Sequence, residues 1–289
     1  MSDLPPAAAS TSAGSTPAAS TPAKKRPELT LEVLRTQTLS PHLVRLVLGG
    51  PGFAAFVPNA FTDSYVKILF PAPGVDYPKG MDLLTAREVL PREQWPVTRT
   101  YTVRRVDLEA RELSIDFVVH GDEGLAGPWA AHAQPGDLVQ ATGPGGAYSP
   151  DTSADWHLFA GDESALPAIA AALEALPEDA QGLAFLETDD AAGQIELSHP
   201  TGVRVQWLHR EGSPATSRVL ARAVSEAQWP EGRVHAFVHG ERESVKALRD
   251  VLFSARGLQR SEVSISGYWA YGRTEDRFQA EKKDPVGKI

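Results

Sequence analysis

The sequence contains no cysteine among its 289 residues. Disulfide bonds, cysteine nucleophiles and cysteine-ligated iron–sulfur clusters are therefore excluded. An electron-transfer role would have to rest on an organic cofactor or on a metal bound by histidine. The eight histidines are scattered without a paired-ligand spacing, which favours surface or core positions over a metal site.

An excess of positive charge is also missing, because 28 Lys and Arg stand against 37 Asp and Glu, a net charge of −9. This balance argues against nucleic acid or an anionic membrane as a partner, although it leaves room for a local basic pocket. No apolar run approaches the roughly 20 residues of a membrane span. The N-terminus has no apolar core of a secretory signal, so we expect a cytoplasmic protein. The Ala, Ser, Thr and Pro content of residues 1–26 predicts a disordered tail.

Short strand patterns fill the first half of the folded chain, with turn signals such as QPGD and GPGG between them. Several short strands punctuated in this way predict a small antiparallel barrel over residues 27–150. The predicted strands are 29–40, 42–50, 64–70, 99–105, 113–120 and 137–145, with TLSP as the first turn.

Beyond Pro150 the pattern changes to strands that alternate with helices, which predicts a parallel sheet covered by helices over residues 151–289. The segment 164–176 shows the clearest helical spacing, with its leucines and Ile169 at steps of three and four. The predicted strands are 156–161, 182–188, 203–210, 234–240 and 261–269, and the predicted helices are 164–176, 217–227 and 244–255.

The strand TRTYTVRR, residues 98–105, carries unusual side chains for a strand. The Arg99 guanidinium offers fixed donors for a phosphate or a ring carbonyl, and Tyr101 offers a flat apolar face. Together they suit an aromatic cofactor, while the alternative is an edge strand that its arginines keep soluble. Alternation places Arg104 on the face opposite Tyr101 unless the strand is bulged there.

Three further stretches stand where strands end. HGDEGLAGPWA (120–130) places glycines before a short predicted helix, which suits either a diphosphate or a plain turn. AGDESALPAI (160–169) lacks the G-x-G-x-x-G fingerprint but joins a strand to a capped helix, where nucleotides bind in open α/β folds. GYWAYGR (267–273) brings aromatics to the edge of the sheet, either over a cofactor ring or as a plug between domains.

In this order the four stretches resemble the siderophore-interacting protein family, FAD-binding ferric-siderophore reductases related to ferredoxin reductases. RTYTVRR is similar to the family's R-x-Y-T-x-R flavin motif, and DFVVHG…WA to its flavin-diphosphate motif. AGDESALPAI resembles its nucleotide-domain signature, SYVKILFP its H-V-K-L-L-F-P strand and GYWAYGR its terminal G-Y-W-R-x-G-R. The resemblance covers residues 28–275 and implies an antiparallel FAD-binding barrel followed by an NAD(P)-binding α/β domain.

The resemblance also implies a set of site residues. Those expected around the flavin ring are Arg99, Thr100, Tyr101 and Thr102. Those expected along the ribityl and diphosphate path are Val118, Val119 and His120, followed by the phosphate turn Gly124, Ala126, Gly127 and Trp129. Those expected near the nicotinamide are Asp162, Glu163 and Ser164, with Gly240 and Glu241 in the A-G-E turn and the terminal aromatics Tyr268 and Trp269. Lys67 and Arg273 are expected to steer the ferric siderophore, and no residue is expected to act as a catalytic acid or base.

Three positions depart from the family pattern. Gly127 stands where the family's phosphate turn often has Ser, and His239 stands at the alanine of A-G-E. Ala270 replaces the arginine of G-Y-W-R, which puts the affinity for anionic siderophores, or a preference for less anionic ones, in question.

The implied chemistry is hydride transfer from NADH or NADPH to FAD and electron transfer to Fe(III), since Fe(II) binds hard oxygen chelators poorly. Carboxylates in LETDD favour the ribose 2′-hydroxyl of NADH, although Arg210 could offset them. Two alternatives stay open, namely a general flavin or quinone-type reductase of the same fold and a ferric-siderophore binding module without catalysis. We expect a monomer without nucleic-acid or stable membrane contacts.

Overall fold

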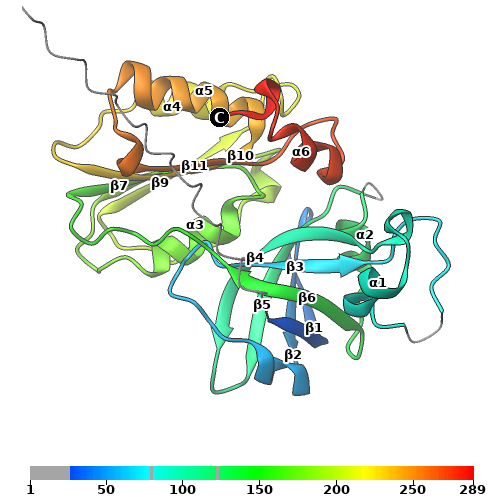
Figure 1. Cartoon of the computed structure of the whole chain (residues 1–289). Helices are drawn as coiled ribbons and strands as arrows, with labels where there is room; N and C mark the ends of the chain where they lie inside the picture. The colour runs from blue at the N-terminus through cyan, green and yellow to red at the C-terminus, as the bar shows by residue number, and fades with distance from the viewer. Residues whose placement is uncertain (1–26, 79–80, 122–123) are drawn as a thin grey trace, which may run out of the picture.

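A computed structural model describes residues 27–78, 81–121 and 124–289 (Figure 1). The predicted disordered tail, residues 1–26, lies outside the described residues. Six antiparallel strands close into a barrel in the order β1-β2-β5-β4-β3-β6, which confirms the predicted architecture. Their bounds are β1 Glu28–Ser40, β2 Leu43–Gly49, β3 Tyr65–Phe70, β4 Val97–Asp107, β5 Glu112–Val118 and β6 Leu138–Gly145.

The barrel closes because alternate residues of its strands are apolar and point inward. Leu29, Leu31 and Val33 of β1 are at most 1% exposed, and Ile115 and Phe117 of β5 are fully buried. The predicted TLSP turn lies slightly too early. β1 runs on to Ser40, and the turn falls at Pro41 and His42.

The second half forms a five-stranded parallel sheet in the order β11-β10-β7-β8-β9, as predicted. Its strands are β7 Trp156–Gly161, β8 Gly182–Thr188, β9 Val203–His209, β10 Val234–Glu241 and β11 Val263–Trp269. Helix α3 (Leu166–Glu174) covers the face toward the barrel, and α4 (Val219–Glu226) and α5 (Arg242–Arg249) cover the other face (Figure 1).

Several helical segments differ from the prediction. The segment predicted as one helix over 244–255 is α5 followed by a π-helical stretch, Asp250–Ala255. Helices α1 (Leu83–Val89), α2 (Ala126–His132) and α6 (Glu275–Glu281) complete the set, and of these only α2 was predicted. Short 3₁₀ turns occupy Pro51–Ala55, Arg92–Gln94, Ala191–Gly193, Arg260–Glu262 and Pro285–Gly287.

A bulge in β4 changes the direction of its arginines. The pairing with β5 shifts between Val103 and Arg105, which interrupts the simple alternation of the strand. Arg104 therefore turns toward α3, where its guanidinium binds the Glu174 carboxylate, with one Nη1–Oε2 distance of 2.9 Å. The strand with the flavin motif is thus tied by an ion pair to the first helix of the parallel sheet.

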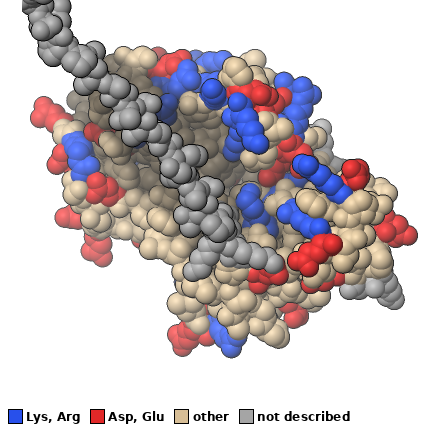
Figure 2. Space-filling model, in the orientation of Figure 1, with Lys and Arg blue, Asp and Glu red and all other residues tan. Residues whose placement is uncertain are grey.

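The surface carries both signs of charge. Acidic and basic side chains are interspersed over the face seen in Figure 2, so the net charge of −9 is not gathered there into one acidic patch. Within the described ranges, no helix has the length and apolar character needed to cross a membrane.

Candidate functional site

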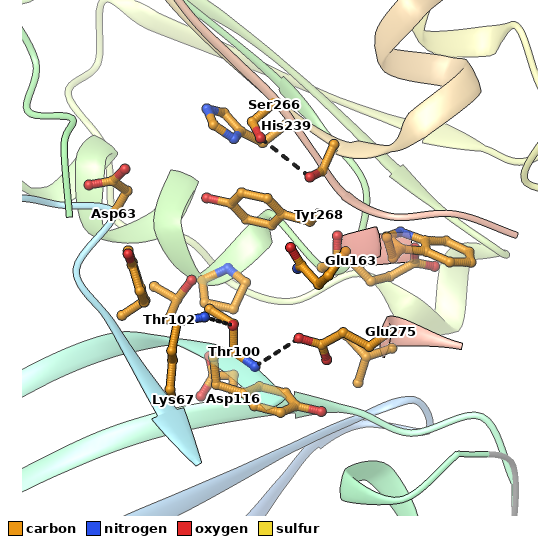
Figure 3. Close-up of a pocket in the computed structure, with 18 of the residues that line it drawn as sticks. Asp63, Lys67, Thr100, Thr102, Asp116, Glu163, His239, Ser266, Tyr268 and Glu275 are labelled. Atoms are coloured by element: carbon orange, nitrogen blue, oxygen red, sulfur yellow. Dashed lines mark hydrogen bonds between the residues drawn. The ribbon is translucent and has the colours of Figure 1, made fainter. Parts of the chain in front are cut away.

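A cavity of about 630 Å³ lies between the barrel and the parallel sheet (Figure 3). The barrel contributes β3, β4 and β5, and the sheet contributes β11 and the turn that follows β7. Helix α6 and the residue that follows it add a third wall through Glu275, Gln279 and Lys282. The two strand systems therefore enclose one space that is large enough for a cofactor ring and a second ligand.

The structure brings ten of the predicted residues to this cavity, namely Lys67, Thr100, Tyr101, Thr102, Val118, His120, Glu163, Ser164, Tyr268 and Trp269. It places the other ten outside the cavity lining, namely Arg99, Val119, Gly124, Ala126, Gly127, Trp129, Asp162, Gly240, Glu241 and Arg273. Five further lining residues had not been predicted as site residues. Asp63, Gln279 and Lys282 lie outside the motifs, whereas Tyr65 and Asp116 stand within SYVKILFP and DFVVHG.

The floor of the cavity is the motif strand β4. The Tyr101 ring packs against Phe117 with a centroid distance of 4.3 Å, which fixes its plane on the barrel core. Burial raises the pKa of Tyr101, and burial likewise raises the pKa of Tyr268 across the cavity, so both phenols stay protonated. Neither hydroxyl has a hydrogen-bond partner among the described residues, which leaves two donors free for a ligand.

Arg99 lies at the edge of this floor and is held by α6. Its guanidinium lies 3.7 Å from Glu275 and 3.4 Å from Asp276, and Glu275 also accepts the Thr100 N–H at 3.3 Å (Figure 3). Burial raises the pKa of Glu275, although the nearby Arg99 opposes that shift. Glu275 and Asp276 of α6 therefore pair with the Arg99 guanidinium of the flavin-motif strand.

Asp162 is a buried junction of three elements and does not line the cavity. One carboxylate oxygen accepts the Ser164 N–H at 2.9 Å and hydroxyl at 2.5 Å, which orders the turn from β7 to α3. The other accepts the Glu241 N–H at 2.7 Å and the Trp269 indole N–H at 2.9 Å. At Gly240, which has φ +145°, a Cβ would come within 2.8 Å of this carboxylate, so the close approach requires glycine.

Glu241 secures the segment that carries the terminal aromatics. Its carboxylate caps α5 by accepting the N–H groups of Glu243 at 2.5 Å and Ser244 at 3.0 Å. The second oxygen accepts the Tyr271 N–H at 3.1 Å. The turn predicted from the A-G-E pattern therefore holds the segment after Trp269 through the Glu241 carboxylate.

A buried charge cluster lies at the carboxyl ends of β7, β8 and β9. The Arg210 side chain is 5% exposed and binds Glu163 at 2.6 Å and Glu187 at 2.8 Å, and it also pairs with Asp189. Burial, and then the nearby Asp162, raises the pKa of Glu163 to about 7. Arg210 is fully engaged by these carboxylates, so its donors are not directed to the cavity.

Helix α2 packs too closely on β5 to admit a side chain at Gly127. A Cβ there would lie 2.9 Å from the Val118 carbonyl oxygen, which explains why this chain has Gly where the resemblance suggests Ser. Trp129 of the same helix faces the barrel core, with its ring 5.9 Å from that of Phe117. Val119 is held by its N–H bond to the His42 carbonyl at 2.9 Å.

Two lysines, Lys67 and Lys282, line the cavity. Lys67 Nζ donates to Thr100 Oγ1 at 3.1 Å, and Lys282 Nζ lies 4.7 Å from the Phe278 ring centre. Burial, and then the charge of Lys67, lowers the pKa of Lys282. In the described part of the chain neither has an ion-pair partner. The segment TEDR (274–277) could have predicted the helix that ends next to Lys282, because Thr274 is a natural helix cap. It could not indicate that this helix packs beside the cavity.

Arg273 and Ala270 add no charge to the cavity. The Arg273 guanidinium binds Glu281 at 2.8 Å, and the same carboxylate receives Arg242 at 2.6 Å and Arg277 at 3.0 Å. Ala270 is 3% exposed and is packed inside the protein. The predicted steering role of Arg273 therefore has no support from its position.

His239, at the alanine position of the A-G-E pattern, borders the cavity from β10. It is 5% exposed, and its ring lies 3.9 Å from that of Phe237. Burial lowers the pKa of His239 to about 3, so the imidazole is neutral. Nε2 lies 3.0 Å from Ser264 Oγ, whereas the buried Nδ1 has no partner.

These features fit an organic redox cofactor better than a metal. The space is bounded by four flat rings, Tyr65, Tyr101, Tyr268 and Trp269. The buried Nδ1 of His239 has no hydrogen-bond partner. In the ranges that the structure describes, no group of three or more His, Asp or Glu is arranged to hold a metal ion. The residues present therefore suit a large aromatic group such as a flavin.

Comparison with known proteins identifies both halves of the chain. The family model described as siderophore-interacting FAD-binding domain matches residues 32–148, and that described as siderophore-interacting protein matches residues 154–272. An uncharacterized Mycobacterium tuberculosis protein is 48% identical, over 90% of this chain and 96% of its own length. Ferric vibriobactin reductase ViuB of Vibrio cholerae is 38% identical, over 87% and 93%.

Solved structures agree with these matches. A siderophore utilization protein from T. fusca is 39% identical and superposes with a TM-score of 0.74, covering 87% of this chain and 96% of its own. Phthalate dioxygenase reductase is 16% identical, with a TM-score of 0.56 over 85% of this chain and 70% of its own, and it shares the fold alone.

A further sequence relative is the NADPH-dependent ferric-chelate reductase of Escherichia coli. It is 31% identical over 83% of this chain and 91% of its own length. The chain belongs to the siderophore-interacting protein family, with a ferredoxin-reductase-like fold and an FAD-binding first half.

Proposed function

We propose that this protein is an FAD-dependent, NAD(P)H-dependent reductase that releases iron from a ferric siderophore. The observation that carries the proposal is the shared cavity, in which the flavin-motif strand, the nucleotide-domain turn and two lysines face one another. When bound, FAD would supply the exchange between two-electron and one-electron chemistry. The protein then needs to bind, orient and exclude water, and no side chain has to act as an acid or base.

The residues would divide this work by position. Tyr101 and Thr102 on β4 would hold the flavin ring from the barrel side, with Tyr268 and Trp269 opposite. Glu163 and Ser164 would border the nicotinamide, and Asp162 would keep their turn in register with Trp269. The turn Gly124–Trp129 would receive the diphosphate, as the family resemblance implies.

The charges in the cavity favour a siderophore complex of low negative charge. Asp116, Glu163 and Glu275 each have an arginine partner outside the cavity lining. The unpaired charges that remain among the described lining residues are those of Lys67, Lys282 and Asp63. One net positive charge suits a neutral or singly negative complex better than a triply negative one.

The nucleotide cluster supports NADH as the donor. A 2′-phosphate needs a free cation, and Arg210 is bound by three carboxylates. The name of the E. coli relative specifies NADPH, so the two chains would differ here. Steady-state reduction with both nucleotides tests this, and a clear preference for NADPH would refute it.

Location in the cytoplasm and a monomeric state also stay predictions.

An anaerobic absorbance titration tests the whole scheme. The pure chain is loaded with FAD, NADH is added, and a ferric siderophore follows. We expect bleaching of the flavin band by NADH and its recovery with the ferric complex. Failure to take up FAD would leave a binding module, and recovery with quinones but not with ferric complexes would indicate a general reductase.

A further inference from the structure

A second cavity, of about 300 Å³, is lined by the part of β4 that follows the residues of the candidate redox site. Its walls come from the bulged stretch Val103–Val106, from the segment before β3 and from α3. It therefore spans the contact between the barrel and the parallel sheet. The two cavities share no lining residue. On β4, Thr102 is the last residue that lines the first cavity, and Val103 is the first that lines the second.

The walls of this cavity combine apolar and polar residues. Phe56 and Val103 are 5% and 4% exposed, Phe61 is 41% exposed at the rim, and Ala171 of α3 lies opposite them. Burial of apolar surface is favourable, so the exposed part of Phe61 offers a contact for an apolar ligand. An apolar ring or chain would bury the exposed part of Phe61.

The cavity also has polar walls, in which two arginines, Arg104 and Arg105, stand against one carboxylate, Glu174. Arg104 is 10% exposed, and its Nε is buried without a hydrogen-bond partner although its Nη atoms bind Glu174. A buried donor without an acceptor is costly, and an added acceptor would remove that cost. Arg105 is exposed at the rim and has no ion-pair partner within the described residues.

The charge balance selects the ligand class. Arg104 and Arg105 contribute two positive charges, and Glu174 contributes one negative charge. One positive charge is left over beside apolar walls, which suits one carboxylate on an apolar body. A divalent anion such as sulfate would lack the apolar part, and a neutral ring would not pair with the guanidinium charge.

We propose that this second cavity binds a small organic acid with a single carboxylate and an apolar ring or chain. The carboxylate contacts the guanidinium groups of Arg104 and Arg105, and the apolar part lies against Phe61 and Ala171. Such a ligand touches both the flavin-motif strand and α3, so it braces the barrel against the parallel sheet.

Ligand-observed ¹⁹F NMR on the full chain tests this with 4-fluorobenzoate as the probe, with and without saturating FAD. We expect saturable binding that FAD does not displace, and at least tenfold weaker binding of neutral 4-fluorobenzamide. Arg105→Gln weakens 4-fluorobenzoate binding by about tenfold. The matched control, Arg204→Gln, changes another exposed strand arginine without an ion partner among the described residues and leaves binding intact.

Ala171→Phe supplies an independent variant, because it fills the cavity from α3 and should abolish binding. Circular dichroism and FAD absorbance show whether this variant is folded. Equal binding of the acid and the amide overturns the proposal, as does unchanged binding to Arg105→Gln. Displacement of the probe by FAD, or loss of binding in Lys67→Gln, places the probe in the first cavity and overturns it too. The readout is binding and not turnover, so it is independent of the proposed reductase activity.

Discussion

Replacement of Asp162 tests whether one buried carboxylate holds the site together. Asp162 is 4% exposed and accepts hydrogen bonds from Ser164, Glu241 and Trp269. Asp162→Ala leaves the fully buried Glu241 N–H without an acceptor, at about 1–3 kcal/mol, while the half-buried donors recover part of their loss from water. We expect a total loss in the free energy of unfolding of about 3–4 kcal/mol.

Asp162→Asn gives a sharper measurement because its shape is unchanged. The amide has one oxygen, so it serves either Ser164 or the pair of Glu241 and Trp269, and its NH₂ group faces donors on the other side. We expect a loss of about 2 kcal/mol in urea unfolding followed by circular dichroism. Tryptophan fluorescence of the folded protein distinguishes the two arrangements, because the Trp269 indole loses its acceptor only when the oxygen serves Ser164.

Asp190→Asn is the matched control. Asp190 also accepts a backbone N–H, from Ala192 at 2.8 Å, but it is exposed, and Asn caps a helical turn equally well. This control should change the stability by less than about 0.5 kcal/mol. Equal effects of the two Asn variants would refute the reasoning that burial and the number of donors make Asp162 a junction.

Three further predictions concern other parts of the molecule. Gly127→Ser should lower the melting temperature and weaken FAD binding, since its Cβ meets the Val118 carbonyl at 2.9 Å, and an unchanged FAD dissociation constant would contradict this. Arg210→Gln should destabilise the chain by about 3–5 kcal/mol in urea unfolding at pH 8, because buried carboxylates lose their cation. The loss should be smaller at pH 5, where those carboxylates bind protons, and a loss that does not depend on pH would oppose the assignment. His157 is 3% exposed, and burial, and then the nearby His235, lowers its pKa to about 4. The unfolded chain therefore binds a proton on His157 between about pH 6.5 and 4 that the folded chain does not, so stability falls as the pH falls through this window. His157→Phe should make that fall shallower, by at most about 1.4 kcal/mol per pH unit, and an unchanged slope in urea titrations would show that His157 does not contribute.

Most strands and the order of the two halves were predictable from local patterns. Strand alternation, turn residues and helical spacing act over a few residues, so β4, β7 and α3 could be located from their own sequence. The motif residues on β4 and β11 likewise follow from short stretches, and the structure brings both to one cavity. The bulge at Val103–Arg105 was only an option in the sequence, because it depends on pairing with a distant strand.

The sequence by itself determined the absence of cysteine chemistry, the barrel followed by a parallel sheet, and the ordered motifs of the family. The tertiary structure alone decided which charges are paired. Arg273 is bound by Glu281, Arg104 by Glu174 and Arg210 by its carboxylate cluster, while Lys282 is directed to the cavity. The physical reason is that an ion pair depends on distance in space, and these partners belong to elements whose packing no local pattern encodes.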